Sequence, residues 1–160
     1  MTFARTATIL SLAFGFDAFL VDRLHKYLQI EIYGWAGGEF HPVAPFLDYV
    51  LVWNPGVSYS LLTGAPPAVI LVVMGVAMAL IALWWWRADT LLSKSGLAII
   101  LGGALSHVID RAIYGAVPDF FHLHWQTWSF YVFNLADAAI TLGVVLLLLD
   151  IVLVRRPKQV

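Results

Sequence analysis

The sequence predicts an all-α membrane protein, with four transmembrane helices and a small β-rich segment between the first and the second. The first observation is composition: of 160 residues, 61% are hydrophobic and only 12% are charged, and the mean hydropathy is +0.85. A soluble domain does not tolerate so apolar a chain. The second observation is segment length, because a helix needs about 20 mainly apolar residues to cross the hydrocarbon core. Within a single integral membrane domain, residues 1–160, four segments reach that length, at about 7–28, 67–86, 95–114 and 134–154.

The first apolar segment occupies the place of a cleavable signal peptide, but we expect it to be retained. It lacks the small-x-small pattern that precedes a cleavage site, and it carries Asp17, Asp22, Arg23 and Lys26. Asp22 and Lys26 are four residues apart, so they share one face of a helix, and the spacing predicts a salt bridge between them.

The insert at residues 29–66 differs from the spans because it is rich in glycine and proline. A β-prone run from Tyr49 to Trp53 precedes the sequence Asn54-Pro55-Gly56, and a second short apolar run follows it. Two such runs on either side of an Asn-Pro-Gly turn predict a short β-hairpin.

The basic residues orient the spans. The loops at 31–66 and 115–133 contain no Lys or Arg, so the positive-inside rule places both termini in the cytoplasm. The third span then runs outward and the fourth returns, which brings Asp119 and Asp137 to a similar depth near the outer surface. The basic residues on the cytoplasmic side are Arg5, Arg87, Lys94, Arg155, Arg156 and Lys158.

Composition also excludes several classes of function. The chain has no cysteine, which excludes disulfides, thiolate metal sites and cysteine nucleophiles. The net charge is −1 and no basic tract is present, which argues against nucleic acid as a partner.

Asp119 and Asp137 are the strongest candidates for chemistry. Two carboxylates that meet at a membrane surface resist ionising together and tend to share one proton. Such a pair can activate water and protonate a carbonyl oxygen, which hydrolyses an amide without a covalent intermediate. The alternative is structural: Asp137 caps the fourth helix, and Asp119 is a loop residue in a Pro-Asp turn.

A polar face is predicted on the third span, where His107, Asp110 and Arg111 follow Gly103 at helical spacings. The small Gly103 allows another backbone or a substrate to approach closely. Ser106 and His107 point to different sides of a helix, which argues against a serine nucleophile. Together with the aspartates, His107, His122 and His124 form only a weak metal signal, and we expect no metal and no other cofactor.

These motifs together resemble lipoprotein signal peptidase, or signal peptidase II, a family of four-span bacterial aspartyl proteases. The likeness covers nearly the whole chain, in matching order and spacing. It rests on Asp22 with Lys26, Asn54-Pro55-Gly56, the segment from Gly102 to Arg111, Val117-Pro118-Asp119-Phe120 and Phe133-Asn134-Leu135-Ala136-Asp137.

The resemblance implies that Asp119 and Asp137 form the catalytic dyad. The implied substrate is a diacylglyceryl-modified prolipoprotein, cut on the N-terminal side of its lipidated cysteine, and globomycin-type peptides are expected inhibitors. The implied setting is the bacterial inner membrane and its lipid, with a periplasmic active site, a β-rich cradle between the first two helices and a monomeric chain. Substrate-binding or supporting roles are implied for Asp22, Lys26, Asn54, Gly56, Gly103, His107, Arg111, Asn134 and Ala136.

One departure concerns Ser106-His107, where the family usually has Gly-Asn. We hypothesise that the dyad stays competent while His107 alters recognition or pH dependence; in the alternative, His107 makes the contact that asparagine makes. Two further functions remain open at this stage. One is a non-catalytic relative that binds lipidated peptides, and the other is a small ion or proton transporter that uses Asp17, Asp22, Asp110 and Asp137 as a relay.

Overall fold

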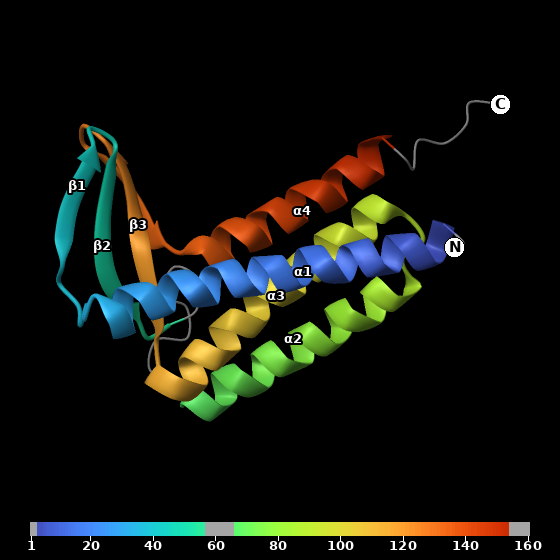
Figure 1. Cartoon of the computed structure of the whole chain (residues 1–160), viewed down its shortest axis with the longest axis horizontal. Coiled ribbons are helices and arrows are strands. Elements are labelled where there is room, and N and C mark those ends of the chain that lie inside the picture. The colour runs from blue at the N-terminus through green and yellow to red at the C-terminus, as the bar shows by residue number, and fades with distance from the viewer. Residues whose placement is uncertain (1–2, 57–65, 154–160) are drawn as a thin grey trace.

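The computed structural model describes residues 3–56 and 66–153. Within these ranges the chain forms four α-helices, one π-helical turn and four β-strands (Figure 1). The helices lie side by side along the long axis, and the sheet lies at one end of them. α1 begins and α4 ends at the opposite end, as a four-helix topology with both termini on one side requires. In chain order the elements are α1 (Phe3–Tyr27), η1 (Leu28–Ile32), β1 (Phe40–Ala44), β2 (Leu47–Asn54), α2 (Pro67–Arg87), α3 (Leu91–Tyr114), β3 (Val117–Trp125), β4 (Trp128–Phe133) and α4 (Leu135–Leu153).

Local chemistry explains where α3 begins and ends. Thr90 is its N-cap, and the Thr90 hydroxyl oxygen accepts a hydrogen bond from the backbone N–H of Ser93 at 3.1 Å. At the other end, Gly115 has a φ of 72°, the left-handed conformation that glycine adopts without strain. The helix therefore stops just before the chain enters β3.

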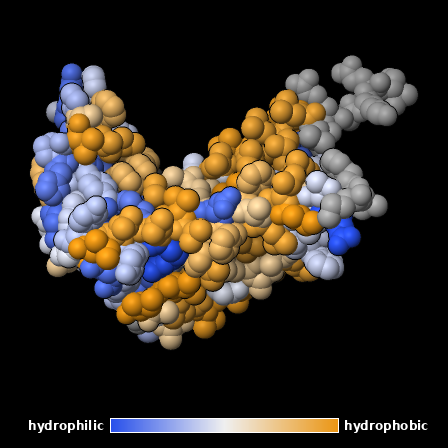
Figure 2. Space-filling view, viewed as in Figure 1, coloured by the Kyte–Doolittle hydropathy of each residue, from blue (hydrophilic) through white to orange (hydrophobic). Residues whose placement is uncertain are grey.

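In the described part of the chain, α2, α3 and α4 are long and apolar enough to cross a membrane. α1 is longer than any of them, at 25 residues, but its charged residues lower its hydropathy. Figure 2 shows hydrophobic residues over most of the helical surface and hydrophilic residues gathered around the sheet end. The prediction of four spanning helices therefore depends on α1.

Glycines let the helices pack closely against the central helix α3. A Cβ atom on Gly102 would lie 2.1 Å from the backbone oxygen of Gly15 in α1. Gly96 and Gly143 meet in the same way, because a Cβ on either one would come within 2.7 Å of the other's carbonyl oxygen. These positions accept only glycine at the present helix separation, as is typical of helix contacts in membranes.

The sheet is antiparallel throughout, in the order β1-β2-β3-β4. It draws β1 and β2 from the insert between α1 and α2, and it draws β3 and β4 from the segment between α3 and α4. The predicted cradle between the first two helices is therefore only half of the sheet.

One sequence alternative needs correction here. Residues 117–125 form β3, so Asp119 lies in a strand opposite Val52 of β2, not in a loop. The predicted hairpin has its second run at residues 58–62, outside the described residues, so it stays a prediction. In the described residues β2 pairs with β1 and β3. Local sequence did not indicate the β2–β3 pairing because these strands are more than sixty residues apart in the chain.

Candidate active site

Asn134 and Asp137 cap the start of α4 reciprocally. The Asn134 Oδ1 accepts a hydrogen bond from the Asp137 backbone N–H at 3.0 Å, and the Asp137 Oδ2 accepts one from the Asn134 backbone N–H at 3.0 Å. This arrangement is a capping box. The structural role considered for Asp137 is therefore present, and the helix N-terminus favours a negative charge at this position.

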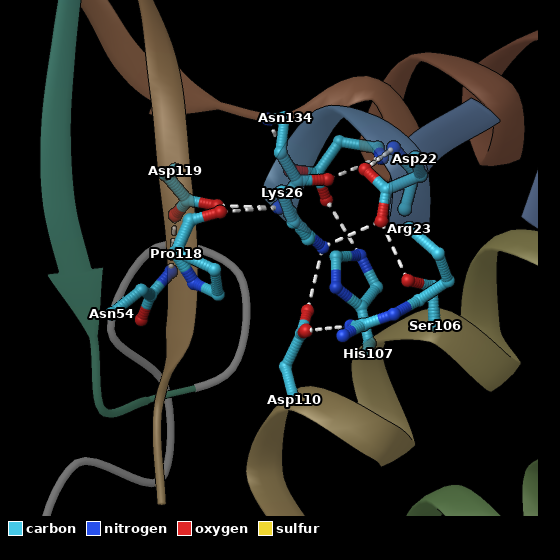
Figure 3. A network of polar contacts seen from close by, with 12 residues as sticks. Asp22, Arg23, Lys26, Asn54, Ser106, His107, Asp110, Pro118, Asp119 and Asn134 are labelled. Carbon is cyan, nitrogen blue, oxygen red and sulfur yellow. Dashed lines mark hydrogen bonds and ion pairs between the residues drawn. The ribbon is translucent and has the colours of Figure 1, made fainter. Parts of the chain in front are cut away.

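Asp119 is held nearby by two amide side chains (Figure 3). Its Oδ1 accepts a hydrogen bond from Asn134 Nδ2 at 2.6 Å, and its Oδ2 accepts one from Asn54 Nδ2 at 3.1 Å. Asp119 is only 3% exposed. Burial, together with the neighbouring charge of Asp137, raises the pKa of Asp119 to about 7, against the lowering effect of the two amide hydrogen bonds. Asn134 thus joins the two carboxylates: its backbone bonds Asp137 and its side chain bonds Asp119.

The turn after β2 is built around the same asparagine. Asn54 Oδ1 accepts a hydrogen bond from the Gly56 backbone N–H at 3.1 Å, which closes an Asx-type turn. Arg111 of α3 braces this turn by donating to the carbonyl oxygens of Pro55, at 3.2 Å, and Gly56. The guanidinium therefore fixes the turn that presents Asn54 to Asp119.

Both aspartates line one cavity of about 480 Å³ between the sheet and helices α2, α3 and α4. Its wall combines polar and apolar side chains, a mixture that suits a peptide bond next to an apolar group. The polar lining residues are Asn54, His107, Arg111, Asp119, Asp137 and Thr141, and the apolar ones include Val52, Met74, Ala104, Val117, Val132 and Ile140.

A buried ionic network lies behind the cavity and joins α1 to α3 and α4 (Figure 3). Lys26 Nζ lies 2.6 Å from Asp22 Oδ2 and 2.6 Å from Asp110 Oδ2, so the predicted Asp22–Lys26 salt bridge is present. Arg23 contacts the other oxygen of Asp110. Two acids and two bases neutralise one another, which is how charges are accommodated in an apolar bundle.

The network also reaches α4 at the residue that precedes Asp137. Asp22 Oδ1 accepts a hydrogen bond from the Ala136 backbone N–H at 2.9 Å. Asp22 Oδ2 accepts another from the Ser106 hydroxyl at 2.6 Å. Because the Ala136 N–H is one of the free donors at the start of α4, Asp22 fixes the first turn that carries Asp137.

The structure brings most of the predicted site residues together. Asn54, Gly56, His107, Arg111 and both aspartates line the cavity. Gly103 and Ala136 do not line the cavity but pack against each other. A Cβ on Gly103 would lie 2.8 Å from the Ala136 carbonyl oxygen, so Gly103 admits a neighbouring backbone, as its size predicts. Asp22 and Lys26 act within the ionic network and do not line the cavity.

Sequence reasoning missed the contacts of Ser106 and Asp110. The sequence predicts Asp110 on one polar face with His107 and Arg111, but its carboxylate faces α1 and pairs with Arg23 and Lys26. The available signal was the four-residue spacing of Gly102, Ser106 and Asp110, which places all three on the side of α3 that contacts α1.

No group of three His, Asp or Glu side chains in the described residues is arranged to hold a metal ion. His122 and His124 are neighbours on β3, and one nitrogen of each lies 3.2 Å and 3.1 Å from Asp48 Oδ2. They do not line the cavity that contains the two aspartates.

The chain is similar to known proteins over most of its length. Residues 16–153 match the family profile described as signal peptidase (SPase) II. The chain is 45% identical to a lipoprotein signal peptidase of Methylocella silvestris over 132 residues, which cover 81% of this chain and 77% of that protein. It is 43% identical to a lipoprotein signal peptidase of Beijerinckia indica over 142 residues, or 85% of each chain.

A solved structure described as a bacterial membrane enzyme, determined by the in meso method at 2.3 Å resolution, has the same fold. The TM-score is 0.78 over 94% of each chain, at 24% sequence identity. A second structure with the same description, at 1.9 Å resolution, gives 0.75 and the same identity, over 90% of this chain and 93% of the other.

Proposed function

The chain belongs to the signal peptidase II family, which removes signal peptides from prolipoproteins, and from this premise we propose that it does so as an aspartic protease with Asp119 and Asp137 as the catalytic dyad. One observation carries the proposal: the two carboxylates line one cavity and are joined through Asn134. The raised pKa of Asp119, about 7, supports a division of roles, with Asp119 protonated and Asp137 ionised.

In the proposed reaction, the Asp137 carboxylate takes a proton from water while the water oxygen attacks the carbonyl carbon of the scissile peptide bond. Asp119 donates its proton to the carbonyl oxygen, and a neutral tetrahedral intermediate forms. When the C–N bond breaks, Asp137 gives its proton to the leaving nitrogen, and a hydroxyl proton of the intermediate returns to Asp119. The signal peptide leaves with a new carboxyl group and the lipoprotein with a new amino group.

We propose diacylglyceryl-modified prolipoproteins as substrates, cut on the N-terminal side of the lipidated cysteine. The family supports this substrate class, and the apolar wall of the cavity supports a lipid-bearing residue beside the dyad. Globomycin-type peptides would compete for the same cavity. We also propose that the enzyme is a monomer.

The proposed setting is the bacterial inner membrane, with α1 as the fourth span and the sheet and dyad at the periplasmic side. Two features support α1 as a span. Its 25 residues extend about 37 Å, enough for a hydrocarbon core of about 30 Å. Asp22 and Lys26 are fully buried and paired inside the bundle, so neither charge meets lipid. The absence of Lys and Arg from residues 31–66 and 115–133 supports the orientation.

The test is cleavage of a diacylated prolipoprotein by the purified protein, followed by the mobility shift that accompanies signal-peptide loss. Asp119→Asn and Asp137→Asn should each abolish turnover. Asp89→Asn is the matched control, because Asp89 is an exposed acid between α2 and α3, away from the cavity. If a folded parent protein retains the prolipoprotein without cutting it, the chain is a lipopeptide-binding relative. If either dyad variant keeps the parent rate, the aspartic mechanism is wrong.

A further inference from the structure

His107 of α3 lies against the proposed dyad. Its Nε2 is 3.2 Å from Asp137 Oδ1, its ring lines the cavity, and its side chain is only 12% exposed. The contact connects α3 to the first turn of α4, close to where Gly103 admits the Ala136 backbone. The imidazole therefore touches one carboxylate of the pair directly.

The two carboxylates differ in the kind of donors they accept. Asp119 accepts hydrogen bonds from two amides, Asn54 and Asn134, which are neutral at every pH. Asp137 accepts one bond from the Asn134 backbone on Oδ2 and has His107 on Oδ1. Of the two carboxylates, only Asp137 has an imidazole as a hydrogen-bond partner among the described residues.

The hydrogen-bonding state of the ring follows from its second nitrogen. His107 Nδ1 is buried and has no hydrogen-bond partner among the described residues. A buried N–H without an acceptor costs more than a buried lone pair without a donor. In the neutral ring the proton therefore lies on Nε2, where it is donated to Asp137.

We propose that His107 is a positioning residue of the dyad, which orients Asp137 through the Nε2–H···Oδ1 bond. The proposal rests on the assignment of Asp119 and Asp137 as the dyad. Asp137 is the base because it lies at the N-terminus of α4, where a negative charge is stabilised, whereas Asp119 is buried beside the charge of Asp137 and keeps its proton.

Other charges face the same region and set the background. Lys26 on α1 lies close enough to act on Asp137 electrostatically, and Arg111, one turn beyond His107 on α3, acts on Asp119. Asp119 on β3 itself experiences the charge of His107.

The experiment measures kcat and KM with the purified protein and a diacylated prolipoprotein. His107→Gln places an amide donor near the position of Nε2, and His107→Leu removes the donor. His122→Gln is the matched control, because His122 also contacts an aspartate, Asp48, but lies outside the cavity.

We expect His107→Leu to lower kcat by about 10- to 100-fold with little change in KM, because a hydrogen bond to a charged group is lost. His107→Gln should recover most of kcat. His122→Gln should keep the parent kcat and KM.

A role for His107 in packing alone would leave His107→Gln as slow as His107→Leu. Failure of His107→Gln to recover kcat therefore overturns the proposed hydrogen bond. Parent-like kcat in His107→Leu overturns the positioning role. If Asp119→Asn and Asp137→Asn are inactive, either of these results refutes the role of His107 but not the assignment of the dyad. If Asp119→Asn and Asp137→Asn are active, the dyad assignment itself is wrong. The two failures are therefore distinguishable.

Discussion

Asn134 is the residue whose substitution separates the structure of the site from its chemistry. Its Oδ1 caps α4, and its Nδ2 bonds Asp119 at 2.6 Å. Asn134→Ser keeps an oxygen that can accept the Asp137 N–H, because serine is as good an N-cap as asparagine, but the shorter side chain cannot reach Asp119. Asn134→Ala removes both interactions. The pair of variants therefore isolates the amide bond to the carboxylate.

The magnitudes follow from the two interactions. Loss of an N-cap to alanine costs about 1 kcal/mol, so Asn134→Ala should lower the unfolding midpoint by about 2–4 °C relative to Asn134→Ser. The amide donates to the carboxylate and so stabilises the ionised form of Asp119. Without it, the pKa of Asp119 rises above about 7, and the alkaline limb of kcat/KM should move up by about one pH unit in both variants.

The assay is the rate of prolipoprotein cleavage against pH, with thermal unfolding measured on the same preparations. Two results would refute the reasoning. If Asn134→Ser unfolds as early as Asn134→Ala, the cap does not stabilise α4. If the alkaline limb stays where the parent has it, either the amide does not tune Asp119 or Asp119 is not the proton donor.

Three further predictions follow from other parts of the structure. Because the pKa of Asp119 is raised from its ordinary 3.8 to about 7, the folded protein holds a proton that the unfolded chain releases, so stability falls as the pH rises from about 4 to 7. This loss, of up to about 4 kcal/mol, should disappear in Asp119→Asn, and equal pH dependence of unfolding in variant and parent would contradict it. Gly143→Ala should destabilise the bundle because its Cβ would lie 2.5 Å from the Gly96 carbonyl oxygen. Gly75→Ala is the control, because a Cβ there would meet nothing within 4 Å. Equal unfolding temperatures of the two variants would show that α3 and α4 can separate. Asp17 is exposed on α1, so Asp17→Leu should leave cleavage unchanged, and ion flux through proteoliposomes that Asp17→Asn abolishes would instead revive the transporter alternative.

Much of the helical fold could be predicted because hydrophobic length is a local signal. The expected span at 95–114 lies inside α3, and the span at 67–86 coincides with α2 to within one residue. β3 is hard to predict because Pro118 and Asp119, two residue types that strands disfavour, interrupt its first half, although residues 121–125 alternate between apolar and polar. Its side chains have neighbours from the helices as well as from the sheet, and its pairing with β2 joins segments that are distant in sequence.

The candidate site was predictable where residues are close in sequence, as at Asp22–Lys26, and less so where helices meet. α3 carries two adjacent stripes at four-residue spacing. Gly102, Ser106 and Asp110 face α1, whereas Gly103, His107 and Arg111 face α4 and the Asn54 turn. The sequence shows both stripes, but only the partner helices decide which polar residue belongs to the ionic network and which to the cavity.

The different surroundings of Asp119 and Asp137 explain how two identical side chains acquire different roles in the proposed dyad. Asp137 is in the first turn of α4, where the capping box, the helix N-terminus and His107 all favour a negative charge. Asp119 is the third residue of β3, is buried and, among the described residues, is bonded only by amides, and its pKa is about 7. Asymmetry between the carboxylates therefore comes from the elements that carry them. Substituting the side chains that donate hydrogen bonds to the two carboxylates should therefore alter the pH profile of cleavage more than it alters substrate binding.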